Sequence, residues 1–439
     1  MMAEIGSTDD AKNAVVLQPR PLPTSACCWH RRDVNCVKIS SSGRFVASAA
    51  DDYRVLISDL VTGRLLYELA HDEACINSLM WLHQQVPHLR LVTGSGNGSV
   101  TIWTLHPNGG CTQTILIRLK EEIDHLEYDV ATDKLLLAFG SFLMVTPSQT
   151  PLDTIKAEHN PLDCSEQIGG AAFLASGTKC LVTLPDRHAI VVLRINGTTL
   201  SVEKTISLSY TPHYASVSSD SMSIGVGGTD GMIRVYDWRK GEDAQEQVVV
   251  SYGRDFITPR SVTFSFIHGS HYLIAGGETE VATVFDLTDG RAIATLYHQK
   301  GCYIHAVTAW SDLNTVRIVT GSSYGRHYVV LWECPIAQFL SPKIQLTGQI
   351  APTLRPGSVH CDHYRPEEIR YPCTLFVPLM ILIAMCLCAF STAQNSTNAP
   401  WRVATDLLLS RFSNFTQKYP LTDVKSAPQK EFFIKWFLI

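Results

Sequence analysis

A strand–turn–strand–turn–strand pattern that recurs along most of the chain constrains its fold more than any other sequence feature. The first copy, residues 34–60 (VNCVKISSSGRFVASAADDYRVLISDL), places apolar runs between a Ser-Gly turn and an Asp-Asp turn. Short Val- and Ile-rich runs between turn residues are typical of β-strands. Four further clear copies end at Leu105, Trp238, Leu287 and Cys334, and two weaker copies lie within residues 123–195. One such unit cannot bury both of its faces alone, so the copies are expected to stack around a common axis.

Six dipeptides at the ends of third strands carry a resemblance to a known family. They are Ser58-Asp59, Trp103-Thr104, Leu193-Arg194, Tyr236-Asp237, Phe285-Asp286 and Trp332-Glu333. Their spacing is roughly 46 residues when the longest gap is counted as two periods, which is close to one four-stranded blade. In position they resemble the Trp-Asp dipeptide of the WD40-repeat family. The resemblance implies an all-β fold, a seven-bladed β-propeller over residues 29–346.

A closed ring of blades needs one strand from each end of the chain in a shared blade. Ala14–Gln18 is the expected N-terminal strand, because it precedes the first full copy and has no blade of its own. Phe339–Leu346 is the competing candidate for closing the ring. The remainder of residues 1–28 is expected to be a leader, because it lacks the basic and apolar regions of a signal peptide.

The WD40 resemblance also implies a buried network of His, Ser or Thr, Asp and Trp side chains within each blade. No copy in this sequence has all four residues. The matching residues are His30, Ser48 and Asp52 in the first copy, His71, Thr93 and Trp103 in the second, Asp230 in the fifth, and Thr320 and Trp332 in the seventh. We expect these residues to have a structural role, since such a network satisfies buried polar groups and fixes turn geometry.

Motifs that carry chemistry are missing from the sequence, and no enzymatic activity is expected. There is no HExxH, GxSxG, P-loop or GxGxxG sequence, and the Gly-rich run at residues 95–99 is expected to be a turn. Cys361, Asp362 and His363 lack a second cluster at zinc spacing, so no metal or cofactor is expected. The 36 Lys and Arg residues against 41 Asp and Glu residues give a net charge of −5, which does not favour nucleic acid as a partner. No small-molecule substrate is expected.

Protein partners are better supported. In the WD40 family, the turns between blades and between second and third strands share one face. In this sequence those turns contain Arg31, Arg32, Tyr53, Arg54, Arg187, His188, Arg254, Tyr324, Arg326 and His327. Arg and Tyr dominate the energetics of many protein interfaces, so we predict that this face binds partners.

A second motif leaves an alternative open. Tyr236-Asp237-Trp238-Arg239 departs by one residue from the WDxR motif and is similar to the motif in WD40 substrate receptors of cullin-RING ubiquitin ligases. The alternative function is therefore a soluble adaptor or substrate receptor of such a ligase. An ordinary strand end followed by a basic turn residue explains the same four residues.

The sequence after the repeats differs in character. Residues 347–372 form a Pro-rich linker, and residues 373–393 (CTLFVPLMILIAMCLCAFSTA) contain no charged residue, as in a transmembrane helix. Residues 394–439 form a tail in which Trp401–Phe415 has the spacing of an amphipathic helix. The leading interpretation is a scaffold held by a single membrane span with the propeller in the cytosol. The alternatives are a buried helix, a mispredicted terminal exon and a cytoplasmic protein.

Overall fold

A computed structural model describes residues 19–349 of the chain, with gaps. The gaps are residues 23–29, 72–73, 84–87, 150–161, 163–166, 175–176, 240–244, 252–262, 278, 299, 324–326 and 340–345. The chain divides into two units, Met1–Gly357 and Ser358–Ile439, and every described residue belongs to the first unit. The predicted span at 373–393 and the predicted helix at 401–415 lie outside the described residues. Among the described residues, no helix reaches the length and apolar character that a membrane crossing needs.

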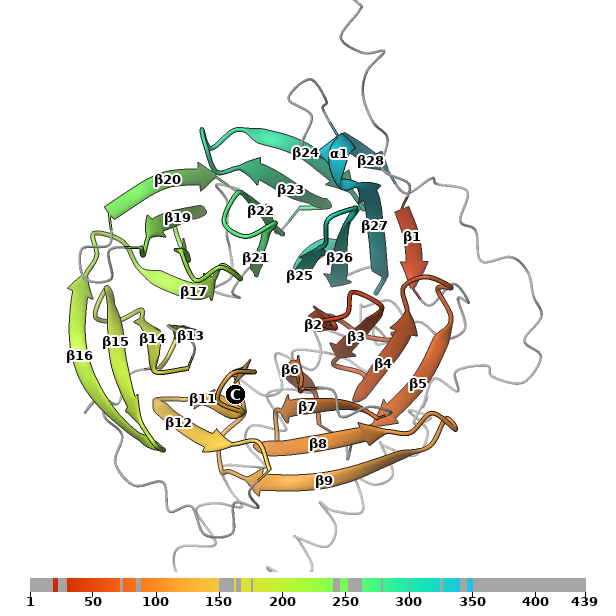
Figure 1. Cartoon of the computed structure of the whole chain (residues 1–439), viewed down its shortest axis with the longest axis horizontal. Coiled ribbons are helices and arrows are strands. Elements are labelled where there is room, and N and C mark those ends of the chain that lie inside the picture. The colour runs from red at the N-terminus through yellow and green to blue at the C-terminus, as the bar shows by residue number, and fades with distance from the viewer. Residues whose placement is uncertain are drawn as a thin grey trace, which may run out of the picture. The chain divides into compact units, whose positions relative to one another are not determined.

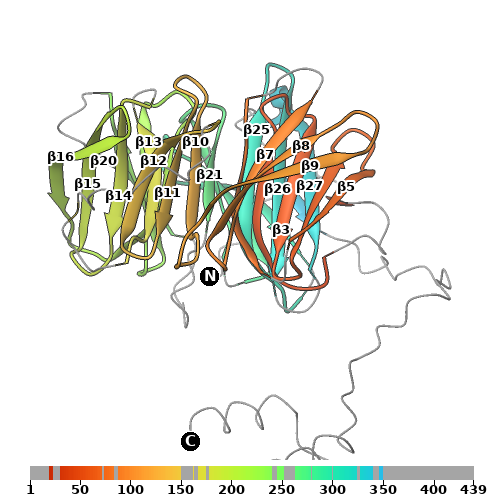
Figure 2. The ribbon, with the colours of Figure 1, turned by 90° about the horizontal axis from the view of Figure 1, so that it is seen from below.

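Seven antiparallel sheets stand around a common axis in the first unit, which confirms the predicted seven-bladed propeller (Figure 1). The inner strand of each blade lies nearest the axis, and the strands run along it (Figure 2). Blade one contains β2 (Val34–Ile39), β3 (Phe45–Ala50), β4 (Arg54–Asp59) and β5 (Leu65–Ala70). Blade two contains β6 (Ile76–Trp81), β7 (Leu89–Ser95), β8 (Ser99–Leu105) and β9 (Cys111–Arg118). Blade three contains β10 (His125–Asp129), β11 (Lys134–Phe139) and β12 (Phe142–Pro147).

Blades four to seven continue the same order. Blade four contains β13 (Gly170–Leu174), β14 (Lys179–Leu184), β15 (Ala189–Asn196) and β16 (Thr199–Ser207), and blade five contains β17 (Pro212–Val217), β18 (Ser223–Gly228), β19 (Met232–Asp237) and β20 (Gln245–Ser251). Blade six contains β21 (Phe264–Ile267), β22 (Tyr272–Ala275), β23 (Val281–Asp286) and β24 (Ala292–Tyr297). Blade seven contains β25 (Tyr303–Ser311), β26 (Thr315–Ser323) and β27 (Val329–Pro335). We call the end of the ring with the second-to-third-strand turns the upper face, and the other end the lower face.

The hydrophobic core is divided among the seven spaces between neighbouring blades. Each of seven clusters of buried apolar side chains contains residues from two adjacent blades. The cluster between blades one and two, for example, joins Val55 and Ile57 of β4 to Leu79 of β6 and Leu91 of β7. Because every blade depends on two neighbours, burial is complete only when the ring is closed.

The ring is closed by β1 (Pro19–Leu22), which pairs antiparallel with β27 as the outer strand of blade seven. The closing strand therefore comes from the N-terminal side, as predicted, but it follows Ala14–Gln18, which lies outside the described residues. Pro19 and Pro21 have no N–H group, which an edge strand tolerates on its open side. Leu22 is 2% exposed and packs in the cluster between blades seven and one. Arg20 donates to the carbonyls of Leu60 and Val61 in blade one.

The chain after blade seven returns to blade six. A short helix, α1 (Ile336–Phe339), follows β27, and β28 (Leu346–Gln349) pairs parallel with β24 as a fifth strand. The competing candidate Phe339–Leu346 therefore does not close the ring, because the strand at its C-terminal end adds to the neighbouring blade. The sheet also continues past the predicted end of the propeller at residue 346.

We predict that Leu22→Ala destabilises the propeller by about 2–5 kcal/mol, because it leaves a cavity at the closing seam that the surrounding strands cannot fill. Unfolding in urea, followed by circular dichroism, measures the change. Leu66→Ala on β5 is the control, since Leu66 is 41% exposed and its removal leaves no buried cavity. Equal stabilities for the two variants would contradict the role of β1.

Candidate functional site

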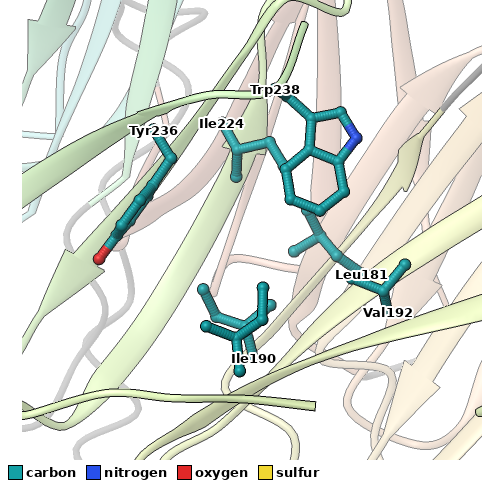
Figure 3. Close-up of a pocket in the computed structure, with 7 residues that line it drawn as sticks. Leu181, Ile190, Val192, Ile224, Tyr236 and Trp238 are labelled. Atoms are coloured by element: carbon teal, nitrogen blue, oxygen red, sulfur yellow. The ribbon is translucent and has the colours of Figure 1, made fainter. Parts of the chain in front are cut away.

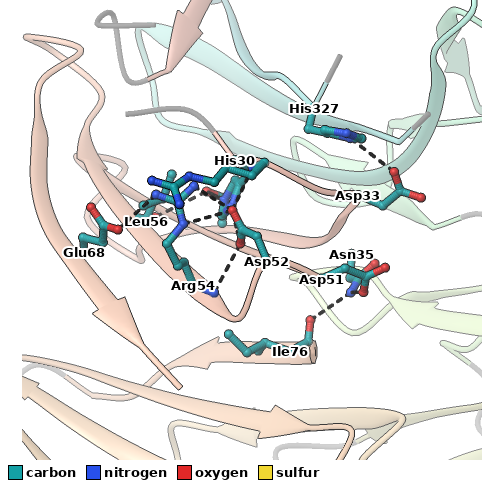
Figure 4. A network of polar contacts seen from close by, with 12 residues as sticks. His30, Asp33, Asn35, Asp51, Asp52, Arg54, Leu56, Glu68, Ile76 and His327 are labelled. Atoms are coloured by element: carbon teal, nitrogen blue, oxygen red, sulfur yellow. Dashed lines mark hydrogen bonds and ion pairs between the residues drawn. The ribbon is translucent and has the colours of Figure 1, made fainter. Parts of the chain in front are cut away.

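The upper end of blade one contains a buried hydrogen-bond network (Figure 4). His30 Nε2 lies 2.8 Å from Ser48 Oγ, and His30 Nδ1 lies 3.1 Å from Asp52 Oδ1. The backbone N–H of Arg31 donates to Asp52 Oδ2 at 2.8 Å. These contacts fix the turn between β3 and β4 against the segment that enters β2.

Asp52 is the charged centre of this network. Burial would raise the pKa of its carboxyl, but the hydrogen bonds from His30, Arg31 and Arg54 outweigh burial and hold the pKa well below its ordinary value. Asp52 is therefore ionised at neutral pH, and its charge is balanced inside the blade.

Arg54 requires a correction to the predicted partner face. The sequence predicts an exposed turn charge, but the residue is 9% exposed. Its guanidinium donates to Asp52 Oδ2 at 2.7 Å and to Glu68 Oε1 at 3.0 Å. Arg54 thus binds the β3–β4 turn to β5, because Asp52 lies in that turn and Glu68 lies on β5.

Blades two and seven contain equivalent networks built around a threonine. In blade two, Trp103 Nε1 donates to Thr93 Oγ1 at 3.1 Å, and His71 Nε2 lies 2.9 Å from the same hydroxyl. In blade seven, Trp332 Nε1 donates to Thr320 Oγ1 at 2.9 Å, and His298 Nε2 lies 2.6 Å from it.

The sequence analysis missed His298. Its separation from Thr320 is 22 residues, the same as that of His71 from Thr93, so the spacing alone could have identified it. Burial lowers the pKa of His298 to about 3, so the imidazole is neutral at physiological pH. A neutral imidazole can form a hydrogen bond with the Thr320 hydroxyl without placing a charge in the core.

Blade five contains a different arrangement from the one that the resemblance implies. The hydroxyls of Tyr210 and Tyr236 lie 2.9 Å apart and are buried. Asp230 belongs to no histidine-centred network and instead accepts from Arg234 at 2.7 Å. The Arg234 guanidinium lies 3.8 Å from the centre of the Tyr210 ring. Tyr210 therefore occupies the place before the first strand where blades one, two and seven have His30, His71 and His298.

A small apolar gap lies beside Tyr236, between blades four and five (Figure 3). Its volume is about 20 Å³, which is room for one water molecule and too small for an organic ligand. The lining residues are Leu181, Ile190, Val192, Ile206, Ile224, Tyr236 and Trp238. We interpret the gap as a packing defect at a position where Tyr replaces the larger Trp.

The remaining predicted contact residues divide into three groups. Arg31, Arg32, Arg187 and His188 are exposed on the upper face, and the Arg32 guanidinium lies 5.6 Å from the centre of the Tyr53 ring. His327 is half-buried, with Nδ1 3.2 Å from Asp33 Oδ1 (Figure 4). Arg254, Tyr324 and Arg326 lie outside the described residues.

At the upper end of blade one, the acidic side chains have partners within the propeller, whereas two arginine side chains form no ion pair among the described residues. We call Arg31, Arg32, Asp33, Asp51, Asp52 and Tyr53 the upper corner. All three of its carboxylates have partners: Asp33 has His327, Asp51 accepts from Asn35 at 2.7 Å, and Asp52 has His30 and Arg54. In the part of the chain that the structure describes, the side chains of Arg31 and Arg32 form no ion pair. The guanidinium groups of Arg31 and Arg32 are therefore exposed on the upper face beside a turn that hydrogen bonds hold in place.

Within the described ranges, no three His, Cys, Asp or Glu side chains are grouped so that they could hold a metal ion. At the lower end of blade five, Arg239 donates to both oxygens of Asp237, and its side chain is 61% exposed beside Trp238. This is where the structure places the residues that are similar to the ubiquitin-ligase motif.

Comparisons with known proteins agree with the fold. A family model described as "WD domain, G-beta repeat" matches residues 23–59. The chain is 30% identical over 157 residues to the WD repeat-containing protein 55 homolog of Drosophila persimilis and 34% identical over 157 residues to that of Drosophila erecta. Each match covers 34% of this chain, and 29% and 30% of the respective relatives.

Longer matches are more distant. WD repeat-containing protein 1 of Xenopus tropicalis is 21% identical over 366 residues, which covers 65% of this chain and 59% of the relative. The solved Cps50 (Swd1) β-propeller domain of Myceliophteria thermophila matches with a TM-score of 0.55 and 15% identity, over 69% of this chain and 97% of that domain. The chain thus spans less than two thirds of the curated relatives that it matches.

The matched repeat, the relatives and the ring of seven blades all support a β-propeller that is similar to those of the WD40-repeat family. Propellers of this family generally bind other proteins.

The blade-one network makes a pH-dependent prediction. The pKa of Asp52 is lower in the folded state, so its contribution to stability is present above the unfolded-state pKa of about 4 and is lost as pH falls below it. Asp52→Asn should therefore cost roughly 1.5–3 kcal/mol at pH 7 and progressively less in acid. Urea unfolding of both proteins from pH 7 to pH 3 tests this, and a constant difference would contradict it.

Proposed function

We propose that the chain is a non-catalytic interaction scaffold that binds an acidic segment of a partner protein at the upper corner of blade one. This proposal rests on one contrast. The carboxylates of the upper corner contact side chains of the propeller itself, whereas Arg31 and Arg32 are exposed and form no ion pair among the described residues. Arginine pairs well with carboxylates, because its planar fork can bind both oxygens at once.

The chemistry of the corner supports a protein partner in two further ways. Tyr53 lies beside Arg32, so an aromatic surface and a cation are offered together, as in many interface hot spots. Tyr53 has a φ of 66° and is held by hydrogen bonds from its own N–H to Ala50 and from His71 to its carbonyl. A preorganised turn loses little conformational entropy when a partner binds.

We predict that Arg31→Glu/Arg32→Glu lowers affinity for an acidic segment at least about tenfold, equivalent to ~1.4 kcal/mol. The probe is a short fluorescein-labelled peptide rich in Glu and Asp, with binding to the full chain measured by fluorescence anisotropy. The melting temperature should stay nearly constant, since exposed charges contribute about 0–1 kcal/mol to stability.

The matched control is Arg64→Glu/Arg291→Glu, which makes the same charge change on exposed arginines of the lower face. The control should retain binding. Equal loss in both double variants would show only a general charge effect, and retained binding in the upper-corner variant would contradict the proposed site.

The exposed Arg239 beside Trp238 favours a second candidate, the adaptor or substrate receptor of a cullin-RING ubiquitin ligase. Co-purification of the full chain with the adaptor subunit of such a ligase, with and without Arg239→Ala, tests this alternative. Recovery of the adaptor that Arg239→Ala abolishes would favour it, and its absence with both proteins would count against it.

Membrane anchoring through residues 373–393, with the propeller in the cytosol, is a further proposal that rests on their uncharged sequence alone. We predict that the full chain stays with membranes after carbonate extraction and that Ile383→Arg weakens this. A charged residue at a helix centre costs about 2.5–3.5 kcal/mol on insertion. Release of the unmodified chain by carbonate would contradict the anchor.

A further inference from the structure

We propose that His88 and His106 form a binding site for a divalent transition-metal ion such as Zn²⁺ at the lower end of blade two. The sequence analysis singled out neither residue. His88 immediately precedes β7, and His106 immediately follows β8. Leu89 of β7 pairs with Leu105 of β8, so the two histidines face each other across the end of the same ladder.

The two imidazoles meet through the same kind of atom. His88 Nδ1 and His106 Nδ1 lie 3.2 Å apart, with ring centroids 4.8 Å apart and the rings nearly perpendicular. Two nitrogens bound at about 2.0–2.1 Å to one tetrahedral Zn²⁺ lie about 3.3 Å apart. The observed separation therefore matches the spacing that one such ion requires, and small rotations of the rings can direct both lone pairs at it.

His106 is held in place before any ion binds. Its backbone N–H donates to Gly110 at 2.8 Å, and its carbonyl accepts from Gly109 at 2.9 Å and from the Tyr67 hydroxyl at 2.7 Å. Its Nε2 lies 3.4 Å from Thr112 Oγ1. When Nε2 donates to that hydroxyl, Nδ1 carries the lone pair, which is the tautomer that ligates metal.

The class of ion follows from the ligands. Imidazole nitrogen suits Zn²⁺, Cu²⁺ and Ni²⁺, whereas Mg²⁺ and Ca²⁺ prefer oxygen. Without an ion, the two Nδ1 atoms can share one proton in a hydrogen bond. Binding requires that this proton move from Nδ1 to Nε2 of His88, so that both Nδ1 lone pairs are free for the ion and both rings stay neutral.

The site is open. Among the described residues, no third His, Cys, Asp or Glu joins the pair to form a metal-binding group. Two protein ligands leave further coordination positions for water or for a side chain of a bound partner.

Isothermal titration of ZnCl₂ into the full chain tests the proposal. We expect one site whose affinity falls at least about tenfold in His88→Ala and in His106→Ala, while circular dichroism shows both variants folded. The matched controls are His271→Ala, which removes an exposed histidine beside His268 on the lower face of blade six, and Cys111→Ser, which removes the exposed thiol of β9.

Both controls should keep the site. Absence of Zn²⁺ binding to the unmodified chain, or binding that survives both His88→Ala and His106→Ala, would overturn the proposal and leave the pair as a proton-sharing contact. Loss of the site in Cys111→Ser or His271→Ala would likewise overturn a site made by these two imidazoles.

Discussion

Closure of the ring between blade seven and blade one is the constraint on which the rest of the structure depends. Every blade buries its faces only against two neighbours, so an open seam would expose one face each of the first and last blades. Further contacts besides β1 cross this seam. Trp310 Nε1 donates to the carbonyl of Ser41, Arg317 donates to the carbonyl of Gly43 at 2.7 Å, and Val34 packs against the buried side of blade seven.

Gly43 illustrates how closely the seam is packed. It has a φ of +69°, and a Cβ atom at this position would lie 2.5 Å from the Trp310 ring. Glycine is required here both for the backbone conformation and for the approach of the indole. Residues more than 250 positions apart are thereby joined, which the turn sequence Ser-Ser-Gly alone does not indicate.

Sequence reasoning was most successful where the repeat dictates geometry. The number of blades follows from a spacing that the copies repeat, and the residues of the blade-one and blade-two networks follow from the resemblance to the WD40 family. It failed where a contact depends on another blade or on burial. The sequence predicts the closing strand at the apolar run Ala14–Gln18, and the structure has it at Pro19–Leu22, because an edge strand needs hydrogen bonds on one side only. Arg54 resembled an exposed turn charge, but Asp52 and Glu68 enclose it.

The candidate site depends on the same rigid framework. The Asp52 carboxylate is paired with Arg54 inside blade one and lies within hydrogen-bond distance of His30, so it forms no ion pair with Arg31 or Arg32 among the described residues. The erosion of the repeat is also informative. Blade five replaces the histidine-centred network with Tyr210 and Tyr236, and a small gap remains between it and blade four. The ring of seven blades thus forms even though the repeats have diverged and the blades differ in their internal contacts.

With β1 in place, the seam between blades seven and one should open no more often than any other junction between blades. Hydrogen exchange of the full chain, measured by mass spectrometry, tests it most directly. We expect the amides of β3 and β26, which lie on either side of the seam, to exchange as slowly as the amides of β14 and β18, which are distant from the seam. Exchange in β3 and β26 that is faster by orders of magnitude would show an open ring and contradict the account.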